Sequence, residues 1–500
     1  MIRFFLVGGW LIFTTSASSQ TFFSTDLSYG TYVSGFKEMR LTDWSRPSFS
    51  ASNGEEPTGR DMTIYIWYPS SSFKAEQMSY GDYVDCSLPD KRRKNNEARR
   101  SLFVQALAQL SGDTSLLLPV LDHLLATRTR AVRNGMMASG RFPIIFFPDR
   151  PLVQSIMCEY LASHGYIVVS PVLKGSFSDA GEYNLRGIET AVSDLQFALG
   201  YIRQNFRTNK LFAVMGLGFN ASHLLAWQMR QQDIRAYISL EGGITTGFEE
   251  QLIEGSPYYD LQRVTASMLI IYAPHPDVNP SLTYKYKYAD RIYQYYPQCS
   301  EFYFLNFGIW EREIKSIFPK ANKGNTWKSF EVAAMSAKKF LDLTLKSQTS
   351  MMTSLTQPVP EVMDARYERA NLLPPPVEEL YQLILERGIN EAERLYHERR
   401  KNDKQPFPFT SFYQVAQLLI QSKAYNDLLV WAQLYADSYP DSAIPYTVWG
   451  RSLLELGRRQ EASEQYKKAL QLVDGDANLS IQEREGYRAA IKERLKETIN

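Results

Sequence analysis

The strongest constraint on how this chain folds is a regular alternation of two kinds of segment between residues 144 and 345. The first kind is mostly apolar: "IIFF", "YIVVSPV", "LFAVMG", "AYISL", "SMLIIYA" and "EFYFLNF". Between these runs lie segments such as "IETAVSDLQFALGYIRQN", whose apolar residues recur every three or four positions. This alternation is typical of a parallel sheet with helices on both faces. Ligands of such sheets bind at the carboxyl ends of the strands, so the residues directly after each run are candidates for a site.

A chain of 500 residues is long enough for more than one domain. Alternating residues in "MTIYIWYP" predict strands near the start, and residues 91–135 predict two helices inserted ahead of the main sheet. Residues 347–376 are rich in proline and polar residues and lack periodicity, as in a linker or a surface strap. The sequence therefore predicts an α/β domain over residues 20–346, a linker, and a helical domain over residues 377–500.

The last part of the chain contains a pattern that repeats after 34 residues. One copy has Tyr446, Trp449, Gly450, Leu453, Gly457, Ala462, Tyr466 and Ala469. The weaker copy before it has Phe412, Ala416, Leu419, Leu428, Ala432, Tyr435 and Pro440. These positions resemble the tetratricopeptide repeat family over about residues 377–500. The resemblance implies stacked helix pairs and a concave surface for a protein or peptide partner.

The N-terminus resembles a cleavable secretory signal. Arg3 precedes an apolar stretch over residues 4–13, and small residues come just before Gln20. The stretch is too short to span a membrane, so we expect no transmembrane segment once residues 1–19 are removed. No cysteine lies near the cleavage point, which argues against a lipoprotein anchor. We therefore expect an exported protein, either periplasmic or extracellular.

The composition excludes some functions. The 55 Lys+Arg residues balance 54 Asp+Glu residues, which argues against bulk binding to nucleic acid. Cys86, Cys158 and Cys299 are too widely spaced for a disulfide framework or a zinc motif, so we expect free buried thiols. Histidines and carboxylates show no metal-ligand spacing, so we predict neither a metal nor a cofactor.

Several segments ahead of and within the sheet narrow the fold further. In order along the chain they are "GTYVSGFKEMRLTDWSRP", "GRDMTIYIWYP", "MSYGDY", "FPIIFF" and "YLASHGYIVV". Together they resemble the platelet-activating factor acetylhydrolase-like and dienelactone-hydrolase-like branch of the α/β-hydrolase superfamily, over about residues 28–345. The resemblance implies a doubly wound, mostly parallel sheet and a Ser-Asp-His triad that acts on small acyl esters.

The segment "AVMGLGFNAS" resembles the nucleophile elbow of these hydrolases, a sharp turn between a strand and a helix. Gly216 and Leu217 match the start of the motif. Gly218 stands where the resemblance puts the serine, and Asn220 stands where a second glycine is usual. Glycine has no side chain with which to attack an ester, although it tolerates the unusual backbone angles of such a turn.

The other parts of the triad are also altered. The acid position of this branch falls on Glu241, and Asp277 occupies the position more usual in the wider superfamily. Trp310 falls about where the histidine is expected. In the loop that normally supplies an oxyanion N–H, Asp149 and Arg150 lie between two prolines, which lack that N–H.

These changes predict a catalytically degenerate hydrolase that binds a ligand or a partner without reacting. The elbow helix would still present its N-terminus to the old pocket, which favours a small carboxylate or an ester-like ligand. The predicted ligand-binding residues are Asp149, Arg150, Gly218, Phe219, Glu241 and His275.

Two alternatives remain open at this point. The chain could be an active serine esterase or lipase with a relocated nucleophile at Ser170, Ser222 or Ser239. His275 could then approach the site from the Asp277 loop. Alternatively, the chain could have a structural or assembly role in which the pocket has no part.

Overall fold

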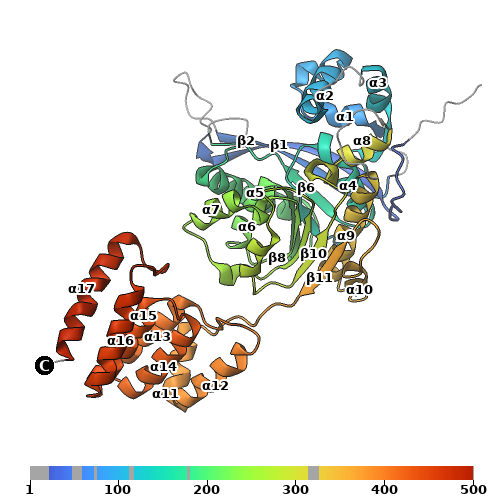
Figure 1. The fold of residues 1–500 in the computed structure, drawn as a ribbon. Helices are drawn as coiled ribbons and strands as arrows, with labels where there is room; N and C mark the ends of the chain where they lie inside the picture. Colours follow the sequence, from blue (N-terminus) through green and yellow to red (C-terminus); the bar gives the residue numbers. More distant parts are fainter. Residues whose placement is uncertain are drawn as a thin grey trace, which may run out of the picture. The chain divides into compact units, whose positions relative to one another are not determined.

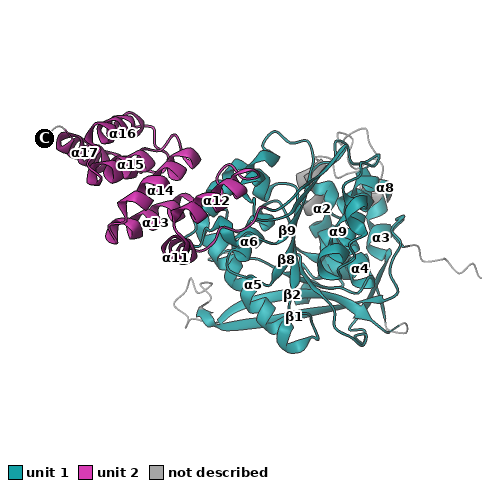
Figure 2. Ribbon diagram, turned by 90° about the horizontal axis from the view of Figure 1, so that it is seen from below, with its two compact units in different colours: residues 1–370 teal, residues 371–500 magenta. Residues whose placement is uncertain are grey.

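The computed structural model describes residues 22–47, 59–72, 76–111, 118–176, 181–313 and 326–498. The predicted leader of residues 1–19 lies outside this part of the chain. The chain divides into two compact units, residues 1–370 and residues 371–500 (Figure 2).

The first unit is built on a mixed sheet of eleven strands in the order β11-β10-β9-β8-β7-β5-β6-β2-β1-β4-β3. The central strands from β6 to β10 run parallel, whereas β2 is antiparallel to both β6 and β1. The N-terminal strands are β1 (Val33–Pro47), β2 (Gly59–Ser70), β3 (Gln77–Ser79) and β4 (Arg128–Arg133). The central strands are β5 (Ile144–Phe146), β6 (Ile167–Pro171), β7 (Phe212–Leu217), β8 (Ile234–Leu240), β9 (Ser267–Tyr272) and β10 (Arg291–Tyr295). The α/β fold class predicted from the alternating segments is confirmed.

Helices cover both faces of this sheet (Figure 1). On one face lie α4 (Pro151–Ser163) and α9 (Thr326–Leu345); on the other lie α5 (Leu185–Asn205), α6 (Phe219–Gln228) and α7 (Gly247–Glu254). Successive residues of a strand point to opposite faces. Accordingly, Ile145 packs in the core under α4 and α9, while Ile144 and Phe146 pack in the core under α5 and α6. This is why the central strands are apolar at most positions.

The region between β3 and β5 holds α1 (Tyr80–Asp85), α2 (Asn96–Ser111) and α3 (Leu118–Ala126). The last two occupy the segment where the sequence predicts two helices. The second predicted helix is too long, however, because the chain leaves α3 at Ala126 and forms β4. In β4 the apolar Ala131 and Val132 are buried against β1, which is a sheet contact that helical spacing does not reveal.

The strand predicted at "EFYFLNF" is wrong, since Glu301–Phe304 forms a 3-10 turn and Phe307–Glu313 forms α8. The last parallel strand is β10 instead. Its polar residues Arg291 and Gln294 are buried and break the apolar pattern that marks the other strands. Arg291 is neutralised by Glu368 of the next strand at 2.9 Å, a residue 77 positions away in the chain.

The segment of residues 347–376, expected to be a linker, is partly structured. Met351–Leu355 forms α10, and Asp364–Glu368 forms β11, which pairs antiparallel with β10 at the edge of the sheet. The segment thus behaves over part of its length as a strap that completes the first unit.

The second unit consists of helices. They are α11 (Val377–Arg387), α12 (Ile389–Arg400), α13 (Phe409–Gln421), α14 (Tyr425–Ser438), α15 (Ala443–Glu455), α16 (Arg459–Leu472) and α17 (Ile481–Glu497). α13 and α15 begin 34 residues apart, at Phe409 and Ala443, and α14 and α16 also begin 34 residues apart. A Cβ at Gly450 of α15 would lie 2.9 Å from the ring of Tyr466 in α16. The small residue therefore permits the close approach of these two helices.

None of the described helices combines the length and the apolar character that crossing a membrane requires. Cys86 and Cys158 are free and buried, and Cys299 is also buried.

Candidate functional site

The turn after β7 places a glycine at the carboxyl edge of the sheet. β7 ends at Leu217, α6 begins at Phe219, and Gly218 between them has φ 51° and ψ −133°. This left-handed backbone favours glycine and is strained for other residues. A Cβ at Gly216 would lie 2.7 Å from the backbone nitrogen of Ala221, so the strand and the helix touch at this point. The segment therefore forms a tight strand-turn-helix with no side chain at its apex.

The residues that follow β8 pack directly on this turn. The Gly218 N–H donates to the carbonyl of Glu241 at 2.7 Å. Gly242 and Gly243 are required here, because a Cβ at Gly242 would lie 3.1 Å from Gly218 Cα and one at Gly243 would lie 2.4 Å from the Gly218 carbonyl oxygen. Glu241 is buried and has φ 42°, which is unusual for a residue with a side chain. The structure thus brings the predicted acid position beside the predicted nucleophile position.

The second candidate acid, Asp277, lies in the loop after β9 together with His275. The backbone N–H of Asp277 donates to Nδ1 of His275 at 3.2 Å, and one Asp277 carboxylate oxygen lies 3.9 Å from the same atom. Because Nδ1 accepts this hydrogen bond, the neutral ring carries its proton on Nε2. A histidine that acts as a general base needs a free nitrogen lone pair facing the nucleophile, and this ring offers none.

Trp310, the position where the sequence places the missing histidine, is not in a loop. It lies in α8, is fully buried, and packs against the rings of Phe103 at 4.8 Å, Phe307 at 4.6 Å and Tyr80 at 5.5 Å. It does not line the pocket at Gly218. Phe307, which the apolar pattern places in a strand, and Trp310 belong instead to the core around α8.

The loop between β5 and α4 has its backbone N–H groups already in use. Asp149 donates its N–H to the Ser170 hydroxyl at 3.1 Å, and Arg150 donates its N–H to the Asp149 carboxylate at 2.7 Å. Pro148 has no N–H to offer. The side-chain amide of Asn220 donates to the Pro148 carbonyl at 3.0 Å and ties this loop to the elbow helix. Burial raises the pKa of the Asp149 carboxyl to about 6.

The three serines considered as relocated nucleophiles are fully buried and do not line the pocket. The Ser170 hydroxyl donates to the Asp149 carbonyl at 2.5 Å and accepts from Gln154 at 2.6 Å, so it holds the β5–α4 loop in place. The hydroxyls of Ser222 and Ser239 have no hydrogen-bond partner among the described residues.

The histidine beside Ser222 also lacks partners within the described structure. His223 is buried, neither of its ring nitrogens has a hydrogen-bond partner, and its ring packs edge-on to Phe219 at 4.5 Å. Burial lowers its pKa to about 4. Of the five histidines in the chain, only His275 lines the pocket.

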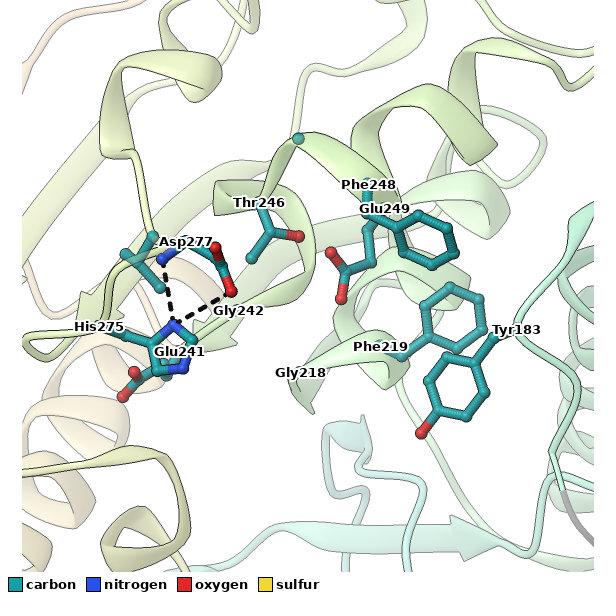
Figure 3. Close-up of a pocket in the computed structure, with 12 residues that line it drawn as sticks. Tyr183, Gly218, Phe219, Glu241, Gly242, Thr246, Phe248, Glu249, His275 and Asp277 are labelled. Atoms are coloured by element: carbon teal, nitrogen blue, oxygen red, sulfur yellow. Dashed lines mark hydrogen bonds and ion pairs between the residues drawn. The ribbon is translucent and has the colours of Figure 1, made fainter.

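A pocket of about 630 Å³ opens at Gly218 (Figure 3). Four of the predicted site residues, together with the alternative acid, line it: Gly218, Phe219, Glu241, His275 and Asp277. The structure does not place the predicted residues Asp149 and Arg150 in this pocket. Arg150 instead lines a separate hollow of about 550 Å³ beside β1 and β2.

Sequence reasoning missed Val278, which directly follows Asp277, and four further side chains of this pocket: Tyr183, Thr246, Phe248 and Glu249. Tyr183 comes just before α5, and the other three lie at the start of α7, several residues beyond the end of β8. A search confined to the residues directly after each strand does not reach them. Extending the search to the first turn of the helix after each strand would have reached Phe248 and Glu249 in α7, but Tyr183 lies in the loop before α5.

The pocket is acidic. Glu241, Glu249 and Asp277 line it, and among the residues that the structure describes no lysine or arginine does. Burial, followed by the negative charge of Asp277, raises the pKa of Glu249. No group of three or more histidine, cysteine, aspartate or glutamate side chains within the described ranges could hold a metal ion.

No family model matches this chain, and no curated protein matches it either. Among solved structures, it is similar to a ferulic acid esterase from Streptomyces cinnamoneus, with a TM-score of 0.51 and 15% sequence identity. The match covers 70% of this chain and 100% of the esterase. At this identity the likeness concerns the fold, which is that of an α/β-hydrolase.

Proposed function

From the premise of an α/β-hydrolase-like fold, we propose that this chain is an exported, non-catalytic binding protein. The observation that carries the proposal is Gly218. The sharp turn that presents a nucleophile in hydrolases of this fold is retained, with φ 51°, and the residue at its apex has no side chain. A chain of this kind keeps the pocket of a hydrolase without the group that attacks an ester.

Two further features support the proposal. Acyl transfer needs N–H donors aimed at a developing oxyanion, and the N–H groups of Asp149 and Arg150 are already bonded within the protein. It also needs a base, and the lone pair of His275 Nδ1 is taken by a backbone N–H. The described residues of this pocket therefore lack the set of groups that hydrolysis of an ester needs.

The alternative is an active serine esterase of small acyl esters with a relocated nucleophile. Ser170, Ser222 and Ser239 are the candidates, and all three are fully buried. An ester would have to reach them through packed side chains, so the non-catalytic proposal is the better supported one.

The second unit supplies the other half of the proposed function. The 34-residue spacing of its helix pairs and the close contact of Gly450 with Tyr466 support a tetratricopeptide-like stack. We assign to residues 371–500 the binding of a protein or peptide partner, and to the first unit the binding of a small molecule. The proposed export rests on the N-terminal sequence pattern. If residues 1–19 are removed on export, the measured mass of the mature protein should place its N-terminus at Gln20.

The experiment is an ester-turnover assay combined with active-site labelling. We expect p-nitrophenyl acetate hydrolysis by the full chain to equal that of a Gly218→Ala variant, and a fluorophosphonate probe to label neither. Gly218→Ser should also remain inactive, because the new hydroxyl would find neither a base nor an oxyanion hole. Turnover that depends on Ser170, Ser222 or Ser239, or labelling at one of them, would establish the esterase alternative.

A further inference from the structure

We propose that the pocket at Gly218 takes an organic cation, namely an amine or quaternary ammonium group carried on an apolar body. This inference rests on the proposed function, because it assigns a ligand class to the same pocket. It departs from the small carboxylate expected from the elbow helix alone.

The charge of the lining is the first reason. Glu241 lines the pocket and is 2% exposed, while Glu249 comes from α7 and Asp277 from the loop after β9. The raised pKa of Glu249 has the Asp277 charge as one of its causes, so these two carboxylates act on each other across the pocket. Among the described residues, His275 is the basic side chain of the lining, 3.9 Å from an Asp277 carboxylate oxygen, and neither a lysine nor an arginine joins it there. A bound carboxylate would add a further negative charge, whereas a bound cation would relieve the repulsion.

The aromatic wall is the second reason. Tyr183 stacks on Phe219 with ring centroids 4.7 Å apart, and Phe248 lies on the same side of the pocket (Figure 3). Tyr183 is 67% exposed and Phe248 is 56% exposed, so large apolar surfaces face the opening. Aromatic faces attract cations and also cover the apolar part of a ligand. Exposed rings opposite carboxylates are therefore suited to a cation with a hydrophobic body.

The arrangement of the carboxylates argues against a metal ion as the cation. Ligands of Ca²⁺ or Mg²⁺ must converge within about 2.0–2.6 Å of one point. Within the described residues, no set of three acidic, histidine or cysteine side chains meets at such a point. In Figure 3, Glu241, His275 and Asp277 lie on one side of the pocket, and Glu249 lies between them and the rings. Groups spread over a pocket of about 630 Å³ match a ligand of several atoms.

The test compares three probes of similar shape and different charge, by calorimetric titration of the full chain. They are 2-phenylethylamine, the neutral 2-phenylethanol and the anionic phenylacetate, with CaCl₂ as a fourth ligand. We expect the amine to bind at least about tenfold more tightly than the alcohol, and phenylacetate not to bind. Raising the salt concentration should weaken binding of the amine.

Variants locate the site. Glu249→Gln and Asp277→Asn should each weaken binding of the amine severalfold, and Phe219→Leu should weaken both the amine and the alcohol. Glu254→Gln, on α7 but outside the pocket, is the matched control and should change nothing. Melting temperatures of all four variants show whether each one is folded.

The outcomes separate this inference from the function on which it rests. Equal binding of the alcohol and the amine, tighter binding of phenylacetate, binding of Ca²⁺ alone, or no binding of any probe would each overturn the cation assignment. If the alcohol or phenylacetate binds and Phe219→Leu abolishes that binding, the proposal of a non-catalytic binding pocket is kept and only the assignment of a cationic ligand is rejected. Ester turnover overturns the proposed function, whichever probe binds.

Discussion

At the scale of single residues, the backbone around Gly218 is held in conformations that most residues avoid. Gly218 has φ 51°, and the neighbouring Glu241 has φ 42° with its side chain buried. Residues in such conformations persist when the surrounding packing determines them, and they cluster at binding sites. Here the packing of Gly242 and Gly243 on Gly218 supplies that constraint. This packing therefore fixes the shape of the turn, which has no side chain at its apex.

A pH-dependent contribution to stability follows from His223. Its pKa falls from 6.5 to about 4 on burial, so the unfolded chain binds a proton between these values while the folded chain does not. Stability is therefore complete above about pH 6.5 and falls as the pH decreases toward 4, by about 3 kcal/mol. In His223→Leu, we expect this part of the pH dependence to disappear. Urea unfolding at pH 4.5, 5.5 and 7.5 measures it.

The neighbouring residue provides the control for this prediction. Ser222 is equally buried and does not titrate, so Ser222→Ala should change the free energy of unfolding by the same amount at every pH. If His223→Leu kept the acid-induced loss of stability seen in the unaltered protein, the loss would arise elsewhere.

At the scale of elements, the loop between β5 and α4 depends on a side chain from the adjacent strand. Ser170 of β6 makes hydrogen bonds to the backbone N–H and carbonyl of Asp149 and to Gln154. If the Ser170 hydroxyl is removed, the backbone groups of Asp149 and the side-chain amide of Gln154 each lose a hydrogen-bond partner. Ser170→Ala should therefore lower the free energy of unfolding by about 1–3 kcal/mol, as measured by urea unfolding.

Ser239 in β8 is the matched control. It is as deeply buried as Ser170, but its hydroxyl has no partner among the described residues. Ser239→Ala should be neutral or slightly stabilising, because removing an unpaired buried hydroxyl removes a desolvation cost. Equal losses in the two variants would show that packing, rather than hydrogen bonding, holds this region.

At the scale of the whole molecule, the second unit has its own core. Among the described residues, the buried cluster of this unit runs from Leu380 to Ile491 and consists of residues of this unit alone. We therefore expect residues 371–500, expressed alone, to fold into a helical domain that unfolds cooperatively. Circular dichroism during heating tests this, and a featureless melting curve would contradict it.

Within that fragment, the packing of α15 against α16 can be tested by the melting temperatures of variants. Gly450→Val would force a side chain into the Tyr466 ring and should cost about 1–3 kcal/mol. Gly486→Ala has open space around it and should not destabilise the fragment. Similar melting temperatures for Gly450→Val and the unaltered fragment would count against the close packing of these helices.

The sequence by itself determined the α/β class and the glycine at the apex of the turn after β7. Both are local properties. A strand that is buried on both faces has few polar residues, so it is visible in the sequence as a mostly apolar run. The glycine at the turn is given directly by the sequence. The sequence pattern failed at β10, because burial of Arg291 depends on Glu368, 77 positions away.

Only the tertiary structure decided which side chains share the pocket. It placed Tyr183, Phe248 and Glu249 beside Gly218, and it left Asp149 and Arg150 outside. The pocket is assembled from loops that follow different strands, so its membership depends on how these loops pack rather than on their distance from a motif. For the same reason the acidic character of the pocket, and the ligand class inferred from it, emerge only once those loops are brought together.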